Sequence, residues 1–457
     1  MSSKEQLKRL LAWLPPQYRQ PPTYWQWRGF LARAQWWDAA RIQAWQLGRL
    51  RALVRFATQH TEGYRELYRR AGCRAEDLRT LADVRALPCT TKELFRDNLE
   101  AFTIRKRPLR YVTTGGSTGI PFGFFERGRT RHIENAFIHS GWARVGWRLG
   151  TPSAVLRGAF VGDAANFARD DAFYRECALS SYYLTPDSVV RYVERVRGAG
   201  LRVLQAYPSS LNLLCDLLAE KNLRGRLDLD WIFLGSENVY AWQLEKFRAT
   251  FPDTRLFAWY GQAEKVLLAP WCEHRQVYHV WPFYGHAEVL DAGGREVAAG
   301  EEGELVGTSF LQWATPLIRY RTLDRAVKGG AACPDCHRQF PMLEAIQGRR
   351  HEVIVTAGGR YISMTAINMH DEIFDPLRQF QFFQEQPGKL VFRYIPKQAA
   401  LSAAERARIQ AGLAGKLGGD VTLDLTPVGE IPRTRLGKYR FLDQRLKIQY
   451  GEDAWSE

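Results

Sequence analysis

A glycine-rich run over 111–121 contains the residue types that bind an anion. It reads YVTTGGSTGIP, with three glycines, four Ser or Thr hydroxyls and no acid. Glycines allow backbone conformations and close approaches that a Cβ would forbid, so consecutive N–H groups can converge on a phosphate. The run lacks the Gly-Lys-Ser/Thr ending of a P-loop and the spacing of a dinucleotide fingerprint. We interpret it as a candidate phosphate-binding loop, with a plain surface turn between two strands as the alternative.

Three cysteines and a histidine form a second candidate site. Cys333 and Cys336 are a Cys-x-x-Cys pair, and Cys272 lies in the segment WCEHRQVYH, which offers His274 and His279. Three Cys and one His are a tetrahedral zinc set in which protein fills all four positions. A filled shell leaves no water to activate, so the pattern predicts a structural zinc site that ties two segments together. A chance trio of reduced cysteines and a disulfide are the alternatives.

Four further motifs follow the glycine-rich run in the sequence. They are WYGQAE at 259–264, YRTLD at 320–324, Gly-Arg at 348–349 and PRTRLGK at 432–438. In this order and at these separations, the five motifs resemble those of the adenylate-forming (acyl-activating, AMP-producing) ligase superfamily. The run LPCTTKELFRDN at 87–98 is similar to a segment of the phenylacetate-coenzyme A ligase-like branch, which includes capsular-polysaccharide-associated members.

The resemblance implies ATP and Mg²⁺ as cofactors and assigns roles to single residues. Glu264 would direct the magnesium ion, because a hard cation prefers oxygen ligands, and Tyr260 would lie against adenine. Asp324 would accept the two ribose hydroxyls with its two oxygens. Lys438 would place a compact charge on the forming acyl–phosphate bond. The β- and γ-phosphates would be held by Thr114, Gly115, Gly116, Ser117, Thr118 and Gly119, and further ATP contacts would come from Ser236, Glu237, Gly261 and Arg349.

Three positions depart from the common pattern of the superfamily. Phe122 stands where many members have Lys, Ala263 replaces the usual Thr, and His351 replaces one of two hinge acids. In the context of the branch, His279 is preferred over His274 as the fourth zinc ligand. Family position also places the acyl pocket around Phe137, Tyr207, Ser236 and Trp259, and the many aromatic residues favour an aryl or other apolar acid.

The elements that must position these residues alternate between helical and β-rich patterns. Short β-rich runs at 153–156, 203–205 and 230–234 are separated by helical patterns, which indicates an α/β domain with largely parallel strands. Ligands of such domains collect where strands end. The run 288–297 predicts a hairpin across Gly293 and Gly294, and 303–308 is a further β-rich run. Thr90 or Thr91 is expected to cap a helix.

Length and hydrophobic pattern predict more than one domain. The chain has 457 residues, too many for one compact core. We expect a Trp- and Arg-rich arm over 1–45, packed on the body, with contact to a membrane surface or partner as the alternative. The ATP- and acid-binding domain with mixed and parallel sheets is expected over 46–348. A small mobile α+β domain carrying the catalytic lysine is expected over 349–457.

The amino-acid composition is typical of a globular protein. The hydrophobic share is 46%, the charged share is 25%, and the net charge is +15. No apolar run is long enough to span a membrane and no secretory signal is visible, so we expect a cytoplasmic protein. The arginines are spread through amphipathic segments, which argues against nucleic acid as a partner and suits ATP, coenzyme A or an acidic carrier protein. The remaining cysteines are expected to be reduced: Cys73, Cys89, Cys177 and Cys215.

The leading functional hypothesis is an enzyme that joins a carboxylic acid to AMP, releases pyrophosphate and transfers the acyl group to coenzyme A. A second hypothesis keeps this adenylation and delivers the acyl group to an amine or a carrier protein. A third, from another class, is a non-catalytic scaffold or a nucleic-acid-binding relative. The residues leave open which acid reacts and whether the protein forms a homodimer.

Overall fold

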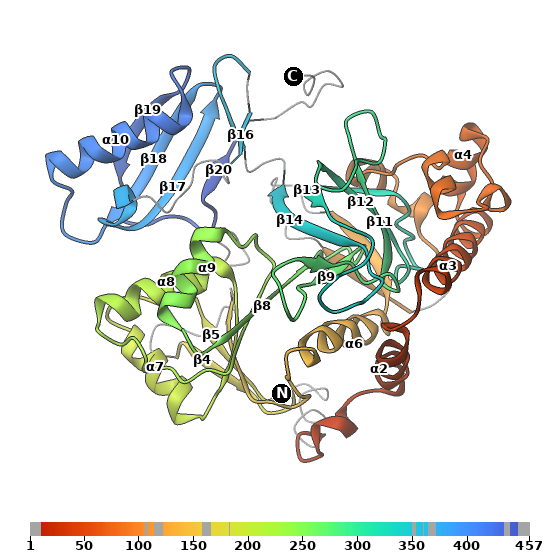
Figure 1. The fold of residues 1–457 in the computed structure, drawn as a ribbon, viewed down its shortest axis with the longest axis horizontal. Helices are drawn as coiled ribbons and strands as arrows, with labels where there is room; N and C mark the ends of the chain where they lie inside the picture. The colour runs from red at the N-terminus through yellow and green to blue at the C-terminus, as the bar shows by residue number, and fades with distance from the viewer. Residues whose placement is uncertain are drawn as a thin grey trace. The chain divides into compact units, whose positions relative to one another are not determined.

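The computed structural model describes residues 11–105, 108–113, 122–157, 166–181, 183–349, 353–359, 361–363, 372–433 and 439–446. These residues form helices and both parallel and antiparallel sheets, so the expected α/β class is confirmed (Figure 1). The chain divides into two compact units. Unit 1 comprises residues 1–151, 172–174 and 257–347, and unit 2 comprises 152–171, 175–256 and 348–457. One crossing between the units falls after Gln347, close to the expected boundary, whereas the division into domains 46–348 and 349–457 stays a prediction.

Unit 1 contains a helical layer and a five-stranded antiparallel sheet. The sheet order is β10-β14-β13-β12-β11. The strands are β10 (Tyr278–His279), β11 (Gly285–Leu290), β12 (Glu302–Ser309), β13 (Tyr320–Lys328) and β14 (Met342–Arg349). A separate hairpin pairs β1 (Leu109–Thr113) with β2 (Gly123–Arg127), and β8 (Arg255–Gly261) pairs antiparallel with β9 (Leu268–Pro270). The helices are α2 (Pro22–Ala34), α3 (Ala39–His60), α4 (Glu62–Ala71), α5 (Lys92–Asp97) and α6 (Thr130–Ala143).

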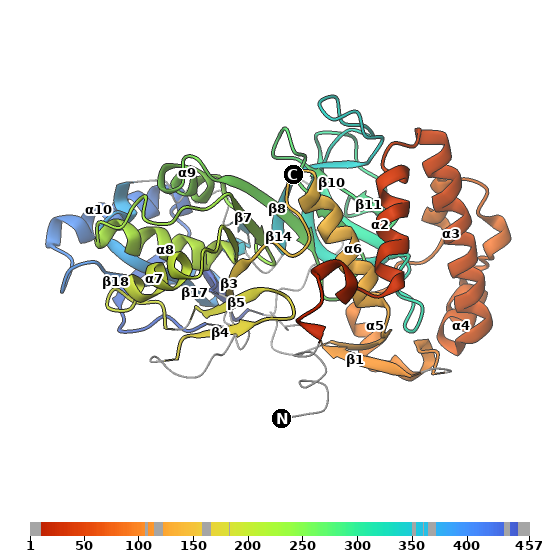
Figure 2. The ribbon, with the colours of Figure 1, turned by 90° about the horizontal axis from the view of Figure 1, so that it is seen from below.

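The N-terminal segment packs on the rest of unit 1, as expected. Helix α2 begins at Pro22, and proline is tolerated there because the first N–H groups of a helix have no acceptor within the helix. The helix runs beside α6 in Figures 1 and 2. Leu31 and Ala34 are fully buried with Phe137 and Phe283 in an aromatic core. Membrane or partner contact by this segment stays a prediction.

Helix starts in unit 1 follow the expected capping chemistry. Thr91 caps α5, because its Oγ1 accepts a hydrogen bond from the Leu94 N–H at 3.2 Å. Thr90 is instead fully buried and donates to the Ile318 carbonyl at 2.8 Å. Of the two candidate caps, Thr91 is therefore the one that the structure uses.

Unit 2 contains a sheet of parallel strands flanked by helices. Strands β5, β3, β6 and β7 are neighbours and parallel, and β4 is antiparallel to β5. The expected strands at 153–156, 203–205 and 230–234 are confirmed as β3 (Ser153–Arg157), β6 (Val203–Ala206) and β7 (Trp231–Gly235). The other elements are β4 (Ala168–Asp171), β5 (Glu176–Ser180), α7 (Val189–Gly198), α8 (Pro208–Glu220) and α9 (Ala241–Thr250).

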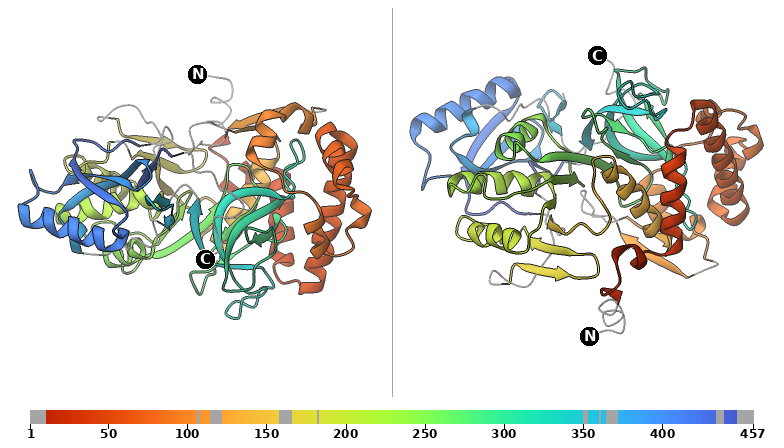
Figure 3. Two further views of the ribbon diagram at one scale, coloured as in Figure 1. Left: turned by 90° about the horizontal axis from the view of Figure 1, so that it is seen from above. Right: turned by 60° about the horizontal axis from the view of Figure 1, so that its bottom comes forward.

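The C-terminal part of unit 2 is a four-stranded sheet with one long helix. Its order is β19-β18-β17-β20, and α10 (Ala403–Leu417) lies along the sheet in Figures 1 and 3. Ile409, Leu413 and Leu417 of α10 recur at helical spacing and are buried in its core. The strands of this sheet are β17 (Leu377–Gln386), β18 (Lys389–Pro396), β19 (Thr422–Pro427) and β20 (Leu442–Gln444), and a separate pair consists of β15 (Val353–Val355) and β16 (Tyr361–Ser363).

The expected hairpin over 288–297 is present but short. The turn has Gly294 at φ +75°, and after it Glu296 forms an antiparallel bridge with Leu290. The Val297 N–H donates to the Val289 carbonyl at 2.9 Å, and the Asp291 N–H donates to the Arg295 carbonyl at 2.8 Å. The longer partner of β11 is β12, which it pairs with from Gly285–Ser309 to Leu290–Glu304.

Candidate functional site

A bulge in β13 positions Asp324. Glu304 pairs with Arg325 and Val306 with Arg321, so residues 322–324 stand opposite Leu305 alone. Leu323 adopts φ +63° in this bulge, a conformation that a branched residue rarely adopts. Such a bulge re-aims the side chains of its strand. As a result Asp324 is 5% exposed, and its Oδ2 accepts a hydrogen bond from Tyr260 Oη at 2.5 Å.

The loop that follows β8 carries Glu264 to the same strand. Glu264 is buried, and its Oε1 accepts a hydrogen bond from the hydroxyl of Tyr320, the first residue of β13, at 3.3 Å. The backbone carbonyl of Glu264 accepts a second bond from Gln312 Nε2 at 3.1 Å. Segment 260–264 therefore contacts β13 at both Tyr320 and Asp324. The structure brings Tyr260, Glu264 and Asp324 together, as the motifs predict.

A buried ion pair of Lys265 also anchors the loop that follows β8. Lys265 has φ +55° and a buried side chain whose Nζ lies 3.0 Å from Glu126 Oε2 and 3.7 Å from Glu134 Oε2. Burial raises the pKa of Glu134, and the charge of Lys265 acts in the opposite direction. Glu126 belongs to β2, the strand that follows the glycine-rich run. Sequence reasoning missed this pair, because a lone Lys and a lone Glu far apart in the chain carry no pattern.

The residue after the glycine-rich run is part of the core. Phe122 is fully buried, and its ring centroid lies 6.1 Å from that of Phe95 and 6.3 Å from that of Tyr320. A lysine at this position would have to bury its charge among aromatic rings. The departure from the superfamily pattern is therefore a packing feature of this chain.

Several sequence-predicted residues lie outside the described residues. For Arg349 the structure describes only the backbone, at the end of β14. Outside the described ranges are Thr114, Gly115, Gly116, Ser117, Thr118, Gly119, His351 and Lys438. Their roles stay predictions.

The remaining predicted ATP and acyl residues are divided between the units. In unit 2, Ser236 has φ +68°, and Glu237 accepts hydrogen bonds from the N–H and Oγ of Ser209 at 2.9 and 3.0 Å. Tyr207 stands at the start of α8. In unit 1, Phe137 is fully buried in the aromatic core, whereas Trp259 is partly buried. Their membership of one acyl pocket stays a prediction.

Unit 2 also contains a cavity of 670 Å³. Helices α8 and α9 contribute Asp216, Trp242 and Lys246 to its wall. Arg433, which belongs to the motif at 432–438, lines it as well. The cavity therefore borders the segment that leads to Lys438.

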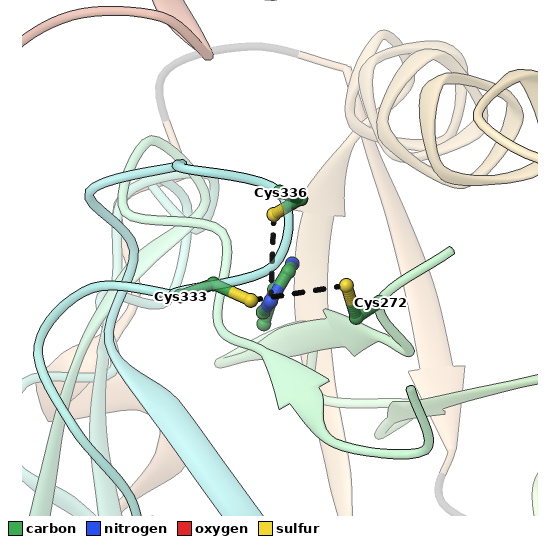
Figure 4. A group of neighbouring side chains, drawn as sticks. Cys272, Cys333 and Cys336 are labelled. Atoms are coloured by element: carbon green, nitrogen blue, oxygen red, sulfur yellow. Dashed lines mark hydrogen bonds between the residues drawn. The ribbon is translucent and has the colours of Figure 1, made fainter. Parts of the chain in front are cut away.

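The predicted metal ligands converge in unit 1. Cys272 follows β9, His279 is on β10, and Cys333 and Cys336 are in the loop between β13 and β14. Their ligand atoms all lie within 4.8 Å of one another, and all four residues are buried. Figure 4 shows the three cysteine sulfurs directed toward a common centre. His279 belongs to this group, as preferred over His274.

One sulfur–sulfur distance in this group matches that of a tetrahedral zinc shell. Cys272 Sγ is 3.8 Å from Cys333 Sγ, and Cys336 Sγ is 3.9 Å from His279 Nε2. Zinc–sulfur bonds of about 2.3 Å at tetrahedral angles put two sulfurs about 3.8 Å apart. The sulfur–sulfur distance is too long for a disulfide, whose bond is about 2.05 Å. The cysteines are free, as expected for a metal site.

Burial governs the protonation of these ligands. It raises the pKa of Cys272 to about 12 and lowers the pKa of His279 to about 3. The imidazole is therefore neutral, which is the form that binds a metal. A thiol in such surroundings needs a bound cation to become a thiolate.

Spanning a membrane requires a long helix of apolar residues. No helix among the described residues is long and apolar enough to cross a membrane.

Known proteins resemble the chain over nearly its whole length, although no protein-family model matches it. A phenylacetate-coenzyme A ligase of Escherichia coli (strain K12) is 23% identical over 440 residues, which are 88% of this chain and 95% of the relative. A phenylacetate-coenzyme A ligase of Thermus thermophilus is 24% identical over 437 residues, which are 88% of this chain and 96% of the relative.

Solved structures share the fold. A 2-hydroxyisobutyryl-CoA ligase in the postadenylation state, in complex with R3-HIB-AMP, superposes with a TM-score of 0.70 at 19% identity, over 90% of each chain. A GH3.15 acyl acid amido synthetase superposes with a TM-score of 0.59 at 15% identity, over 87% of this chain and 88% of that one. The fold is thus found in enzymes with different acyl acceptors.

Proposed function

We propose that this chain, a homologue of phenylacetate-coenzyme A ligases with the fold of adenylate-forming ligases, activates a carboxylic acid with ATP and transfers the acyl group to coenzyme A. The acid's carboxylate attacks the α-phosphate of ATP, which forms an acyl–AMP anhydride and releases pyrophosphate. The thiol of coenzyme A then attacks the acyl carbon, and AMP leaves. The observation that carries the proposal is the convergence of Tyr260, Glu264 and Asp324 on one strand.

The nucleotide would be held by this group of side chains. Asp324 would accept hydrogen bonds from the two ribose hydroxyls while Tyr260 fixes the orientation of its carboxylate. Tyr260 would lie against adenine. The glycine-rich run and Lys438 would hold the phosphates and the developing charge.

Glu264 suits a magnesium ion by its surroundings. It is a buried carboxylate that has no ion-pair partner among the described residues, and a buried charge of this kind is costly without a cation. When bound, Mg²⁺ would offset the negative charge of the phosphates. Glu264 would hold this ion, while Tyr320 would keep its carboxylate in place and Gln312 would hold its backbone carbonyl.

The acid is proposed to be aryl or otherwise apolar. Trp259 immediately precedes Tyr260, and its ring centroid lies 5.4 Å from that of Trp142. An apolar wall beside the nucleotide would favour an acid without a second charge. Incubation with ATP, Mg²⁺, hydroxylamine and a panel of aryl, alkyl and hydroxy acids would trap the acyl group as a hydroxamate. The proposal requires hydroxamate and pyrophosphate with at least one acid.

The acceptor is tested separately, because the fold also occurs in an amido synthetase. Coenzyme A, amines and a carrier protein would be compared with the acid that gives hydroxamate. Thioester formation with coenzyme A supports the proposal. If amides form and coenzyme A gives no product, the adenylation step of the proposal stands. The transfer to coenzyme A would then be replaced by transfer to an amine.

The buried group of Cys272, His279, Cys333 and Cys336 is proposed to hold a structural zinc ion. Its filled shell supports a stabilising role, joining the loop after β9 to the loop before β14. The zinc would stand apart from the chemistry and would maintain the geometry of unit 1.

Removal of one ligand tests this role. Cys336→Ser is expected to reduce zinc retention and to lower the free energy of unfolding by about 2 kcal/mol, because a weaker ligand takes the fourth position. Zinc per chain would be measured by atomic absorption, and stability by denaturant unfolding. Cys215→Ser, which changes a buried cysteine of unit 2, is the matched control and should leave zinc content unchanged. Wild-type zinc content in Cys336→Ser would contradict the proposal.

A further inference from the structure

The backbone around Glu264 is held in place by hydrogen bonds to three consecutive carbonyls. Lys265 is 6% exposed, and its Nζ donates to the Ala263 carbonyl at 3.2 Å. The Glu264 carbonyl accepts from Gln312 Nε2 at 3.1 Å. The Lys265 carbonyl accepts from Ser309 Oγ at 2.6 Å. These bonds satisfy the buried carbonyls and fix the point from which the Glu264 side chain extends.

The same Nζ of Lys265 is paired with a carboxylate of strand β2. It lies 3.0 Å from Oε2 of Glu126, which is 1% exposed. Alternate residues of a strand point to the same face, so Glu126 shares its face with Phe124, which is fully buried. A carboxylate at such an inward position is costly without a cation. Lys265 supplies that cation.

Glu126 belongs to the hairpin that flanks the glycine-rich run. Strands β1 and β2 pair antiparallel with Thr113 opposite Gly123, so the residues on either side of the run are held next to each other. Arg110 of β1 stands opposite Glu126, and its Nε lies 3.6 Å from Glu126 Oε1. One carboxylate therefore connects Lys265 to both strands of the hairpin.

A second carboxylate near Lys265 shows that charge balance alone does not require this connection. Glu134 of α6 lies 3.7 Å from Lys265 Nζ through its Oε2. Its Oε1 accepts a hydrogen bond from Tyr284 Oη at 3.2 Å. One carboxylate is sufficient to balance one lysine, and Glu134 supplies it from outside the hairpin. What Glu126 adds is the connection to the hairpin.

We propose that Lys265 is a positioning residue that holds Glu264 in register with the β1–β2 hairpin. The inference rests on the proposed function, in which Glu264 directs the magnesium ion that accompanies the triphosphate. Lys265 then sets the affinity for the triphosphate part of the nucleotide and not for the nucleoside part, because the bond between Tyr260 and Asp324 does not involve it. A lysine that only stabilised the fold would affect both parts.

Two glutamate substitutions separate these roles. Glu126→Gln and Glu134→Gln each remove one negative charge near Lys265 with little change of shape, and each leaves the lysine one carboxylate. Dissociation constants of the full-length protein for MgATP and for adenosine would be measured by calorimetry, without an acid substrate. We expect Glu126→Gln to weaken MgATP binding by about 10-fold or more, the usual effect of losing a residue that supports a metal ligand. Its adenosine binding should be unchanged. Glu134→Gln is the matched control and should bind both ligands as the wild type does.

Lys265→Met tests the lysine itself. Its MgATP affinity should fall at least as far as that of Glu126→Gln. Adding Glu126→Gln to Lys265→Met should cause no further loss, because the two residues act through one contact and their effects are not additive. Additive losses would mean that the two residues act separately and would contradict the inference.

The remaining outcomes are equally decisive. Wild-type MgATP affinity in Glu126→Gln, equal losses in the two glutamate variants, or a parallel loss of adenosine affinity would overturn the inference. If Glu126→Gln does not fold, Glu126→Asp decides, since it keeps the charge and withdraws it from Lys265 by one methylene. Weaker MgATP binding with unchanged adenosine binding then supports the inference, and wild-type affinity for both overturns it. Wild-type protein that binds neither MgATP nor adenosine would instead disprove the proposed function.

Discussion

Replacement of Lys438 with alanine is expected to slow acyl-adenylate formation by about 10²- to 10³-fold. This factor is the usual cost of losing one group that stabilises charge in a transition state. Lys438 follows Gly437, a residue that lets the loop approach a ligand. It lies outside the described residues, but the chain directly after it is fixed. Tyr439 Oη accepts a hydrogen bond from the Phe380 N–H of β17 at 3.1 Å, and the Arg440 carbonyl accepts one from Gln381 Nε2 at 3.1 Å.

Two half-reactions separate this role from a general loss of structure. ATP–pyrophosphate exchange reports adenylation and should fall in Lys438→Ala. Thioester formation from a chemically prepared acyl-adenylate should stay within a fewfold of wild type, because the anhydride has already formed. Lys416→Ala, which changes a lysine in the last turn of α10, should leave both rates unaltered. Exchange at the wild-type rate in Lys438→Ala would remove this residue from the proposed chemistry.

The convergence of Cys272, His279, Cys333 and Cys336 could be predicted from sequence, because a metal site requires a fixed set of residue types. A Cys-x-x-Cys pair, a third cysteine and a nearby histidine suffice to propose the site. The structure adds the burial and the short distances between the ligand atoms, and it places His279 in the group.

The proposed nucleotide-binding residues and the fold could likewise be predicted from the sequence only in part. Tyr260, Glu264 and Asp324 were found from motifs, but the bulge that directs Asp324 was not, because β13 reads as an ordinary strand from Tyr320 to Lys328. The parallel strands of unit 2 follow from apolar runs between helices. The pairing of β11 with β12 does not, because β12 begins beyond the turn at Gly293 and Gly294 and no local pattern marks it as the longer partner of β11.

Asp324→Ala is expected to lower kcat/KM for ATP by about 100- to 1,000-fold. A hydrogen bond to a charged group contributes about 1.5–3 kcal/mol, and the carboxylate is proposed to accept two of them from ribose. Tyr260→Phe is the control for the hydroxyl that orients Asp324, since it removes the 2.5 Å bond but keeps the carboxylate itself. This variant should lose less than Asp324→Ala. Unfolding measurements would check that both variants remain folded.

Nucleotide analogues test whether Asp324 binds the ribose hydroxyls. Wild-type enzyme should use 2′-deoxy-ATP and 3′-deoxy-ATP less well than ATP, because each lacks one hydroxyl for the carboxylate. In Asp324→Ala these penalties should vanish, since a double-mutant cycle shows coupling only between groups that interact. Equal penalties in wild type and Asp324→Ala would mean that the ribose is bound elsewhere. In that case the buried Tyr260–Asp324 bond would serve only to hold segment 260–264 against the bulge in β13.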